Sequence, residues 1–172
     1  MIQAKVNTKE LQDLLKKLST VSEGVKRKGE VQIEASARRI EKKAKNRAPS
    51  GADGILKASI NVRGSKLERE VYSDTKYAPY VEFGTKSKTE IPSELKRYAS
   101  QFKGGSGGSF ADLQKSIKRW AEKKGIPEEA VFPIAMNIAK FGVKAQPFLF
   151  PAFFEERPKL IKNLAKVLKG IR

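Results

Sequence analysis

Acidic side chains are the residues of this sequence whose chemistry would suit general acid–base catalysis or metal binding. They occur as two adjacent pairs and as isolated residues, namely Glu128-Glu129, Glu155-Glu156, Asp53, Asp74, Glu82 and Asp112. Each pair lies at or near a predicted helix start, where the helix dipole favours anions, so helix-end electrostatics is preferred to acid–base chemistry. The isolated acids are too scattered to predict a metal site, and an oxygen-only magnesium site, as in many nucleases, stays open as an alternative.

The residue types that are missing exclude most other active sites. The 172 residues include no His and no Cys, which removes the usual zinc ligands and the side chain best suited to proton transfer near neutral pH. Ser59 and Ser73 therefore have no His partner for a serine triad. The glycine-rich segments 51–54 and 104–108 lack the strand, helix and Lys-Ser/Thr ending of a phosphate loop. We predict no catalytic residue, no metal, no cofactor and no enzymatic activity.

Basic residues outnumber acidic ones by 36 to 19, which gives a net charge of +17. The net charge is +7 over residues 1–50, zero over 51–85, +6 over 86–145 and +4 over 146–172, so the excess lies on predicted helices. Two interpretations are equally open: solvated helix faces, or proximity to nucleic acid, whose phosphates a basic field attracts without base readout. The candidate DNA-facing residues are Arg38, Arg39, Lys42 and Lys43.

Two segments are dense in aromatic residues and proline, residues 77–85 and residues 146–154. The first shows neither the helical period nor a steady strand alternation. Tyr and Phe bury a large area at low entropic cost, and Pro restricts the backbone beforehand, so each segment should form a core corner or a rigid contact surface. The candidate subunit-contact or structural residues are Tyr77, Tyr80, Glu82, Phe83, Gly84, Thr85, Phe148 and Pro151.

Two of the side chains in apolar surroundings are interpreted individually. Glu82 lies in an otherwise apolar segment and has two open interpretations. It is either a surface carboxylate on an edge strand, or a buried or interfacial charge that pairs with Arg, Lys or backbone N–H groups and fixes the register. Trp120 is expected to be a core anchor rather than an exposed stacking platform.

The first half of the chain predicts a long helix beside a small sheet. Apolar residues at helical spacing predict a helix over residues 8–19, and a second helix with an Ala-rich apolar stripe ends at Pro49. Alternation predicts strands over residues 57–63 and 67–73, joined by a turn at residues 64–66. Residues 80–83 are expected to add a third short strand, which Gly84 ends.

The second half predicts helices. Residues 86–145 are expected to form a helical insertion within a single domain spanning residues 1–172, with helices over 92–102, 109–125 and 127–141. A last amphipathic helix, marked by apolar residues from Leu160 to Ile171, follows the second aromatic segment. No apolar run approaches eighteen residues and no signal-peptide core is present, so we expect a soluble protein made in the cytoplasm.

Three segments in order carry a resemblance to a known family: residues 54–60 (Gly-Ile-Leu-Lys-Ala-Ser-Ile), residues 77–85 and residues 146–152. Together they resemble the tail-component family of long-tailed bacteriophages and prophages, the neck and tail-completion proteins of the head–tail junction. Residues 120–126 and 141–144 resemble segments of longer members. The likeness spans residues 25–160, and the loop at residues 50–53 departs from the Val-Asp-Thr-like sequence of many relatives.

The resemblance implies an α+β fold in which a long helix packs on a small antiparallel sheet, with a helical insertion and a C-terminal helix. It implies a structural virion protein that acts in head–tail joining or tail completion as part of a homo-oligomeric ring. The implied location is the neck or tail of the virion, after synthesis in the host bacterial cytoplasm. The implied partners are neck or connector proteins, tail tube or terminator proteins, and DNA contacted non-specifically in the channel.

Two other function classes stay open beside the virion protein. One is a monomeric basic module that binds nucleic acid without sequence preference. The other is a magnesium-dependent nuclease, which the lack of His disfavours.

Overall fold

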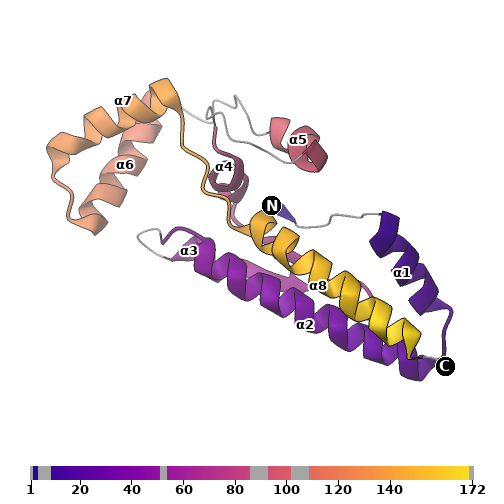
Figure 1. Cartoon of the computed structure of the whole chain (residues 1–172). Coiled ribbons are helices and arrows are strands. Elements are labelled where there is room, and N and C mark those ends of the chain that lie inside the picture. Colours follow the sequence, from indigo (N-terminus) through magenta and orange to yellow (C-terminus); the bar gives the residue numbers. More distant parts are fainter. Residues whose placement is uncertain (1, 4–8, 51–53, 86–92, 102–108, 171–172) are drawn as a thin grey trace.

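The computed structural model describes residues 2–3, 9–50, 54–85, 93–101 and 109–170 (Figure 1). Two long helices, α2 (Glu23–Arg47) and α8 (Leu149–Lys169), lie side by side and run in opposite directions. A three-stranded antiparallel sheet packs against α2. The predicted α+β class, with its long helix and C-terminal helix, is confirmed.

The pairing of α2 with α8 follows from small and large apolar residues on facing stripes. On α2 the buried residues recur at helical spacing, and most are small: Ile33, Ser36, Ala37, Ile40 and Ala44. Small side chains let a second helix approach closely. Leu160 and Leu164 of α8 are buried beside Ile33, and helix α1 (Lys9–Ser19) covers this end of the pair with Leu11 and Leu18. As predicted, the long helix ends just before Pro49.

The sheet consists of β1 (Ile2–Gln3), β2 (Ile60–Arg63) and β3 (Glu70–Ser73), in the order β1-β3-β2. Strands β2 and β3 form the predicted hairpin, with Ile60 opposite Ser73 and Arg63 opposite Glu70. The turn needs glycine at residue 64, because its φ is 101° and an added Cβ would lie 2.5 Å from the Glu68 carbonyl oxygen. Strand β2 is shorter than predicted, since α3 (Ile55–Ala58) precedes it.

The third predicted strand, over residues 80–83, is wrong. These residues belong to helix α4 (Ala78–Phe83), and the third strand of the sheet is β1. Pro79 occupies the first turn of α4, where the missing N–H of proline costs no hydrogen bond. As predicted, Gly84 ends the segment: it has a φ of 69° and donates its N–H to the Tyr80 carbonyl oxygen.

Most of the second aromatic segment is also helical, whereas the sequence predicts that the last helix follows that segment. Helix α8 begins at Leu149 and runs through the aromatic residues, so it starts more than one turn earlier than the amphipathic pattern indicates. This end of α8 is buried on several sides, with Leu149, Phe150, Ala152 and Phe153 all in the core. A helix buried on several sides has no polar face, and its period cannot be recognised from hydrophobicity alone.

The remaining helices are α5 (Ser93–Ser100), α6 (Phe110–Lys124), the short η1 (Glu128–Ala130) and α7 (Val131–Phe141). Ser109 and Asp112 form a capping box at the start of α6, and Gly125 ends it in the left-handed region. Helices α6 and α7 pack on each other as a hairpin that projects beyond one end of α2 and α8 (Figure 1).

Trp120 corrects another expectation, because its side chain on α6 is exposed instead of anchoring a core. The buried residues of the hairpin helices are instead Ala121, Val131 and Ala135. In the described ranges, no helix is long and apolar enough to cross a membrane. Asp53 and the glycine-rich loop at residues 104–108 lie outside the described residues.

Candidate functional site

The carboxylate of Glu82 joins the two aromatic segments. Its side chain is 1% exposed. Oε2 accepts hydrogen bonds from the backbone N–H groups of Phe148 (2.8 Å) and Leu149 (2.9 Å), and Oε1 accepts one from Phe150 (3.0 Å). Glu82 therefore binds the N-terminus of α8, where backbone N–H groups have no partner within the helix. Of the interpretations open from the sequence, the structure shows the buried carboxylate paired with backbone N–H groups.

The electrostatics of Glu82 combine two opposing effects. Burial raises the pKa of Glu82 above its usual value, and the hydrogen bonds from Leu149, Phe148 and Phe150 act in the opposite direction. The positive end of the α8 dipole also favours the anion. The helix terminus thus offsets part of the cost of burying the carboxylate, and the carboxylate satisfies three N–H groups that would otherwise be buried without acceptors.

Hydrogen bonds beside Glu82 hold the chain segments that lead into α8. Gln146 donates its N–H to the Val81 carbonyl oxygen at 2.8 Å. Thr85 donates its N–H to the Val143 carbonyl oxygen at 3.1 Å, and the Thr85 hydroxyl accepts the Val143 N–H at 2.8 Å. Because these bonds connect residues 81–85 with residues 143–150, the two aromatic segments form one unit at the base of the α6–α7 hairpin. We call this unit the Glu82 anchor.

Aromatic packing surrounds the Glu82 anchor. Phe148 is fully buried, and the rings of Phe83 and Phe150 lie 5.6 Å apart between centroids. Pro151 and Tyr80 are half-buried, whereas Tyr77 is exposed at the start of α4. Among the candidate contact residues, Glu82, Phe83, Gly84 and Phe148 are therefore internal to one copy of the protein, and Tyr77 faces solvent.

A second polar cluster ties α2 to α8. Arg39 Nε lies 2.5 Å from Oε1 of Glu156, whose side chain is fully buried. Lys43 Nζ lies 3.2 Å from Glu155 and 3.6 Å from Glu156, and Arg47 also pairs with Glu155. The Arg47 and Lys43 side chains hold the pKa of Glu155 below its usual value. The pair Glu155-Glu156 thus lies within α8 and binds α2, which corrects its assignment to a helix start.

The cluster predicts the effect of removing Arg39. Replacing Arg39 by Ala leaves the buried Glu156 without its closest cation, so we expect the free energy of unfolding to fall by about 1.5–3 kcal/mol. Lys42 is exposed one turn away on α2. Lys42→Ala is the matched control, with an expected change within about 0.5 kcal/mol. Urea unfolding followed by circular dichroism measures both values. Equal stability of the two variants would show that the Arg39–Glu156 pair is not structural.

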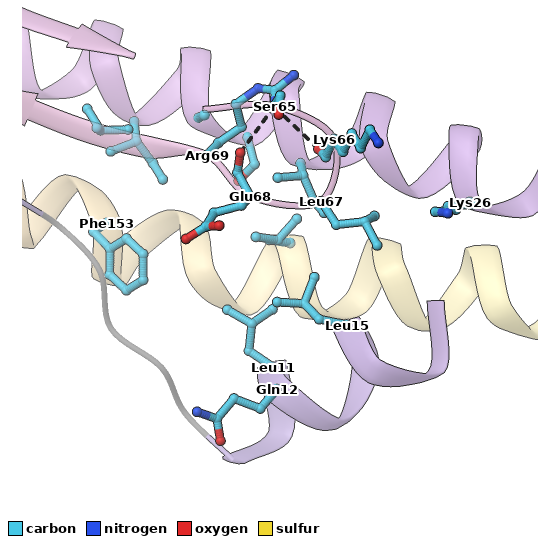
Figure 2. A pocket seen from close by; sticks show the side chains of 16 residues that line it. Leu11, Gln12, Leu15, Lys26, Ser65, Lys66, Leu67, Glu68, Arg69 and Phe153 are labelled. Carbon is cyan, nitrogen blue, oxygen red and sulfur yellow. Dashed lines mark hydrogen bonds between the residues drawn. The ribbon is translucent and has the colours of Figure 1, made fainter. Parts of the chain in front are cut away.

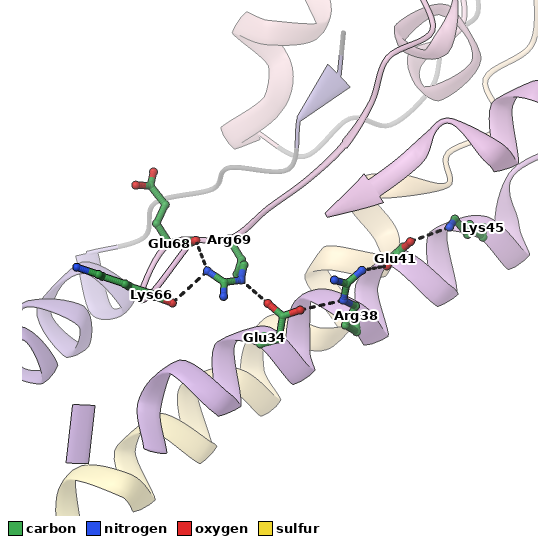
Figure 3. Close-up of polar contacts among 7 residues, drawn as sticks. All are labelled: Glu34, Arg38, Glu41, Lys45, Lys66, Glu68 and Arg69. Carbon is green, nitrogen blue, oxygen red and sulfur yellow. Dashed lines mark hydrogen bonds and ion pairs between the residues drawn. The ribbon is translucent and has the colours of Figure 1, made fainter. Parts of the chain in front are cut away.

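Arg38, another candidate DNA-facing residue, also forms ion pairs within the chain. Its guanidinium pairs with Glu34 at 2.9 Å and with Glu41 at 3.1 Å (Figure 3). Glu34 also pairs with Arg69 of the β2–β3 turn, which holds the pKa of Glu34 below its usual value. The network therefore fixes the hairpin turn on α2. Of the four candidates, Arg38, Arg39 and Lys43 lie in ion pairs, and Lys42 has none with the described residues.

A different set of cations is unpaired. Four exposed lysines of α8 form no ion pair in the described part of the chain: Lys159, Lys162, Lys166 and Lys169. Their spacing places them on one side of α8, opposite the buried Leu160 and Leu164, over about 15 Å of helix axis. We call this set the α8 lysine row. The sequence could have indicated it, because no acid follows Glu156 in this helix.

The remaining acids do not gather into a metal site. Within the described ranges, no group of three or more Asp and Glu residues is placed to hold a metal ion. Asp112 caps α6, and Glu128 pairs with Lys118. Asp112 and Glu128 therefore have structural roles.

Comparison with known protein families gives a match to part of the chain. Residues 12–84 match the sequence model of a family described as "Bacteriophage HK97-gp10, putative tail-component". The matched part holds most of α1, the long helix α2, the β2–β3 hairpin and α4, and it ends at Gly84. Comparison with curated proteins and with solved structures finds no match. Residues 12–84, which are less than half of the chain, are therefore similar to the HK97-gp10-like family of bacteriophage tail components.

Proposed function

We propose that this protein is a structural virion protein that acts in head–tail joining or tail completion as part of a ring. The family match over residues 12–84 is the observation that carries the proposal. The Glu82 anchor and the α2–α8 ion pairs support it, because in both of them the buried polar groups hold helices together. A non-enzymatic role fits this use of the acids, and the neck or tail of the virion is the proposed location.

The proposed mechanism is assembly of rigid copies. The Glu82 anchor fixes the start of α8 and the base of the α6–α7 hairpin relative to α4, so the hairpin is presented in a defined direction. Neck or connector proteins on one side, and tail tube or terminator proteins on the other, are the proposed partners. Rigid presentation reduces the entropic cost of association, which favours binding between preformed surfaces.

We assign the proposed DNA contact to the α8 lysine row instead of the basic residues of α2. Duplex DNA carries one charge per about 1.7 Å of axis, so a ring with unpaired lysines around its channel would attract it. Screening acts over about 8 Å in physiological salt, and only cations that line the passage would contribute. Arg38, Arg39 and Lys43 are already neutralised by carboxylates.

Replacing the four lysines of the α8 row by Gln should weaken binding to non-specific duplex DNA. We expect the slope of log K against log salt concentration to decrease in magnitude by about 3–4, close to one for each lost phosphate contact. The matched control replaces four exposed lysines elsewhere, Lys16, Lys17, Lys28 and Lys115. Fluorescence anisotropy over a salt series measures both. An equal loss in the control would mean that binding follows total charge, as expected for the alternative of a basic binding module.

Mass photometry and a cleavage assay test the proposed function against its alternatives. Discrete rings, alone or with neck and tail proteins, support the structural role. A stable monomer with a steep salt dependence on DNA would support the nucleic-acid-binding module. Plasmid cleavage that requires magnesium, and that is lost when one acid is replaced, would show a nuclease and contradict the proposal.

A further inference from the structure

Helix α7 is apolar on two adjacent sides. Among its eleven residues, only Asn137 and Lys140 are polar. One side packs on α6 with Val131 and Ala135 buried, whereas Phe132 and Met136, about 100° further round the helix, are 57% and 47% exposed. Large apolar side chains that are exposed together are typical of an interaction site. The exposed side of α7 therefore has the composition of a contact surface.

The exposed side of α7 continues onto α6. The ring of Phe110, at the start of α6, lies edge-on to Phe132 with 6.1 Å between centroids. Glu129 precedes Phe132 on the same side, and Lys140 follows Met136 by one turn. We call Glu129, Phe132, Met136 and Lys140 the α7 outer face. It runs from an acidic end to a basic end over about 17 Å.

A groove on the main body has matching properties (Figure 2). Its volume is about 670 Å³, and its walls come from α1, α2, the β2–β3 turn and α8. Apolar side chains dominate the lining, including Leu11, Leu15, Leu67 and Phe153. Of the described side chains in the wall, Ser36 Oγ is a buried polar atom without a hydrogen-bond partner. The apolar part of this lining suits apolar side chains of a protein partner.

The groove and the α7 outer face also agree in length and in the order of their charges. Along α2 the groove extends from Lys26 to Ile40, which is about 21 Å of helix. Lys26 stands at one end, whereas Glu68 lies toward the other end, on the side of Phe153 (Figure 2). A helix of about 17 Å fits this length. With Glu129 near Lys26 and Lys140 near Glu68, opposite charges meet at both ends.

The groove and the outer face of one copy lie far apart. The α6–α7 hairpin projects beyond the end of α2 and α8 where α8 begins, and α1 lies at the opposite end of these helices (Figure 1). The hairpin cannot fill the groove of its own chain while the Glu82 anchor holds its base.

We propose that the α7 outer face of one copy docks into the α1–α2 groove of the next copy. Because two different surfaces meet, the contact is heterologous, and repeated contacts close into a ring when the rotation allows it. The inference rests on the proposed ring and adds the surfaces that build it. It places the α6–α7 hairpin at the subunit boundary.

The absence of Cys makes disulfide trapping a direct test. One variant carries Lys140→Cys, and the other carries Gln12→Cys. Gln12 lies in the groove wall beside Leu11. Both positions are exposed and outside the apolar contact. After mixing and oxidation, we expect the mixed dimer to form about tenfold faster than with Lys140→Cys and Lys76→Cys, an exposed position that does not line the groove, since docking raises the effective concentration only for the correct pair. Lys140→Cys with Lys162→Cys of α8 is the second control.

A further variant separates docking from folding. Met136→Glu, added to the Lys140→Cys chain, changes an exposed side chain and should leave the unfolding midpoint unchanged. It should reduce cross-linking with Gln12→Cys to the level of the control pairs.

The outcomes distinguish this inference from the proposed function. If mass photometry finds rings but the expected pair cross-links no faster than the controls, the proposed docking geometry is wrong. The proposed ring would not be contradicted by that result. Fastest self-cross-linking of Lys140→Cys would indicate symmetric hairpin pairing and also overturn the inference. If neither rings nor specific cross-links form, both proposals fail.

Discussion

The Glu82→Ala variant is expected to lose about 3–5 kcal/mol of unfolding free energy. The substitution leaves the N–H groups of Phe148, Leu149 and Phe150 buried without their acceptor. It also removes the anion that the N-terminus of α8 favours. Chemical denaturation followed by circular dichroism gives the free energy. Hydrogen exchange gives a local readout, because the amides of these three residues should exchange faster than in the wild type.

Two further variants give this prediction its controls. Glu82→Gln keeps the size and one acceptor oxygen, so a smaller loss of about 1–2 kcal/mol is expected. Glu128→Ala removes an exposed carboxylate at the start of η1 and should change stability by no more than about 0.5 kcal/mol. A Glu82→Ala protein as stable as Glu128→Ala would contradict the anchoring role.

Replacing Phe148 by Ala should cost about 3–5 kcal/mol, and Phe83→Ala should have a similar effect. Both side chains are buried where α4 meets the start of α8, and Phe83 contacts the ring of Phe150. Truncation removes the transfer free energy of the ring and leaves a cavity in the core. Thermal and denaturant unfolding of the purified variants measures the loss.

Val31→Ala serves as the control for this pair, since Val31 on α2 is exposed. Its effect on the unfolding of the monomer should stay within about 0.5 kcal/mol. Wild-type-like unfolding of both Phe83→Ala and Phe148→Ala would mean that the two aromatic segments do not form the core described above.

Helices with one polar face could be predicted closely from the sequence. Residues 8–19 correspond to α1, and the stripe that ends at Pro49 corresponds to α2. The same holds for α6, whose capping residue Ser109 and terminating Gly125 both act as their types suggest. In each case a local signal, amphipathic period or cap, agrees with the tertiary environment.

Segments buried on several sides could not be predicted in the same way. Residues 80–83 and 149–154 have no polar face, so their hydrophobicity carries no period, and both are helical. Trp120 shows the converse: it lies on an apolar stripe at helical spacing, yet its side chain is exposed, whereas the smaller Ala121 beside it is buried. Periodicity identifies an apolar face and does not say what covers it.

The polar contacts of the candidate site depend on tertiary structure. Glu82 could be identified as unusual from its apolar neighbours, but its partners lie 66 to 68 residues away in sequence. The pairing of Arg39 with Glu156 spans 117 residues, so the basic stripe of α2 was indistinguishable from a DNA-binding surface. The sequence identifies the charged residues of both helices. Which of these charges remain unpaired depends on the antiparallel packing of α2 on α8.

Electron microscopy of tailed particles produced by the organism that encodes this chain tests the proposed structural role most directly. A fusion tag on the protein, detected by a bound antibody fragment, should mark one axial level at the junction of head and tail or at the end of the tail. A stop codon in the same gene should leave heads and tails unjoined. Wild-type particles assembled without the protein, with no label on any particle, would contradict the account.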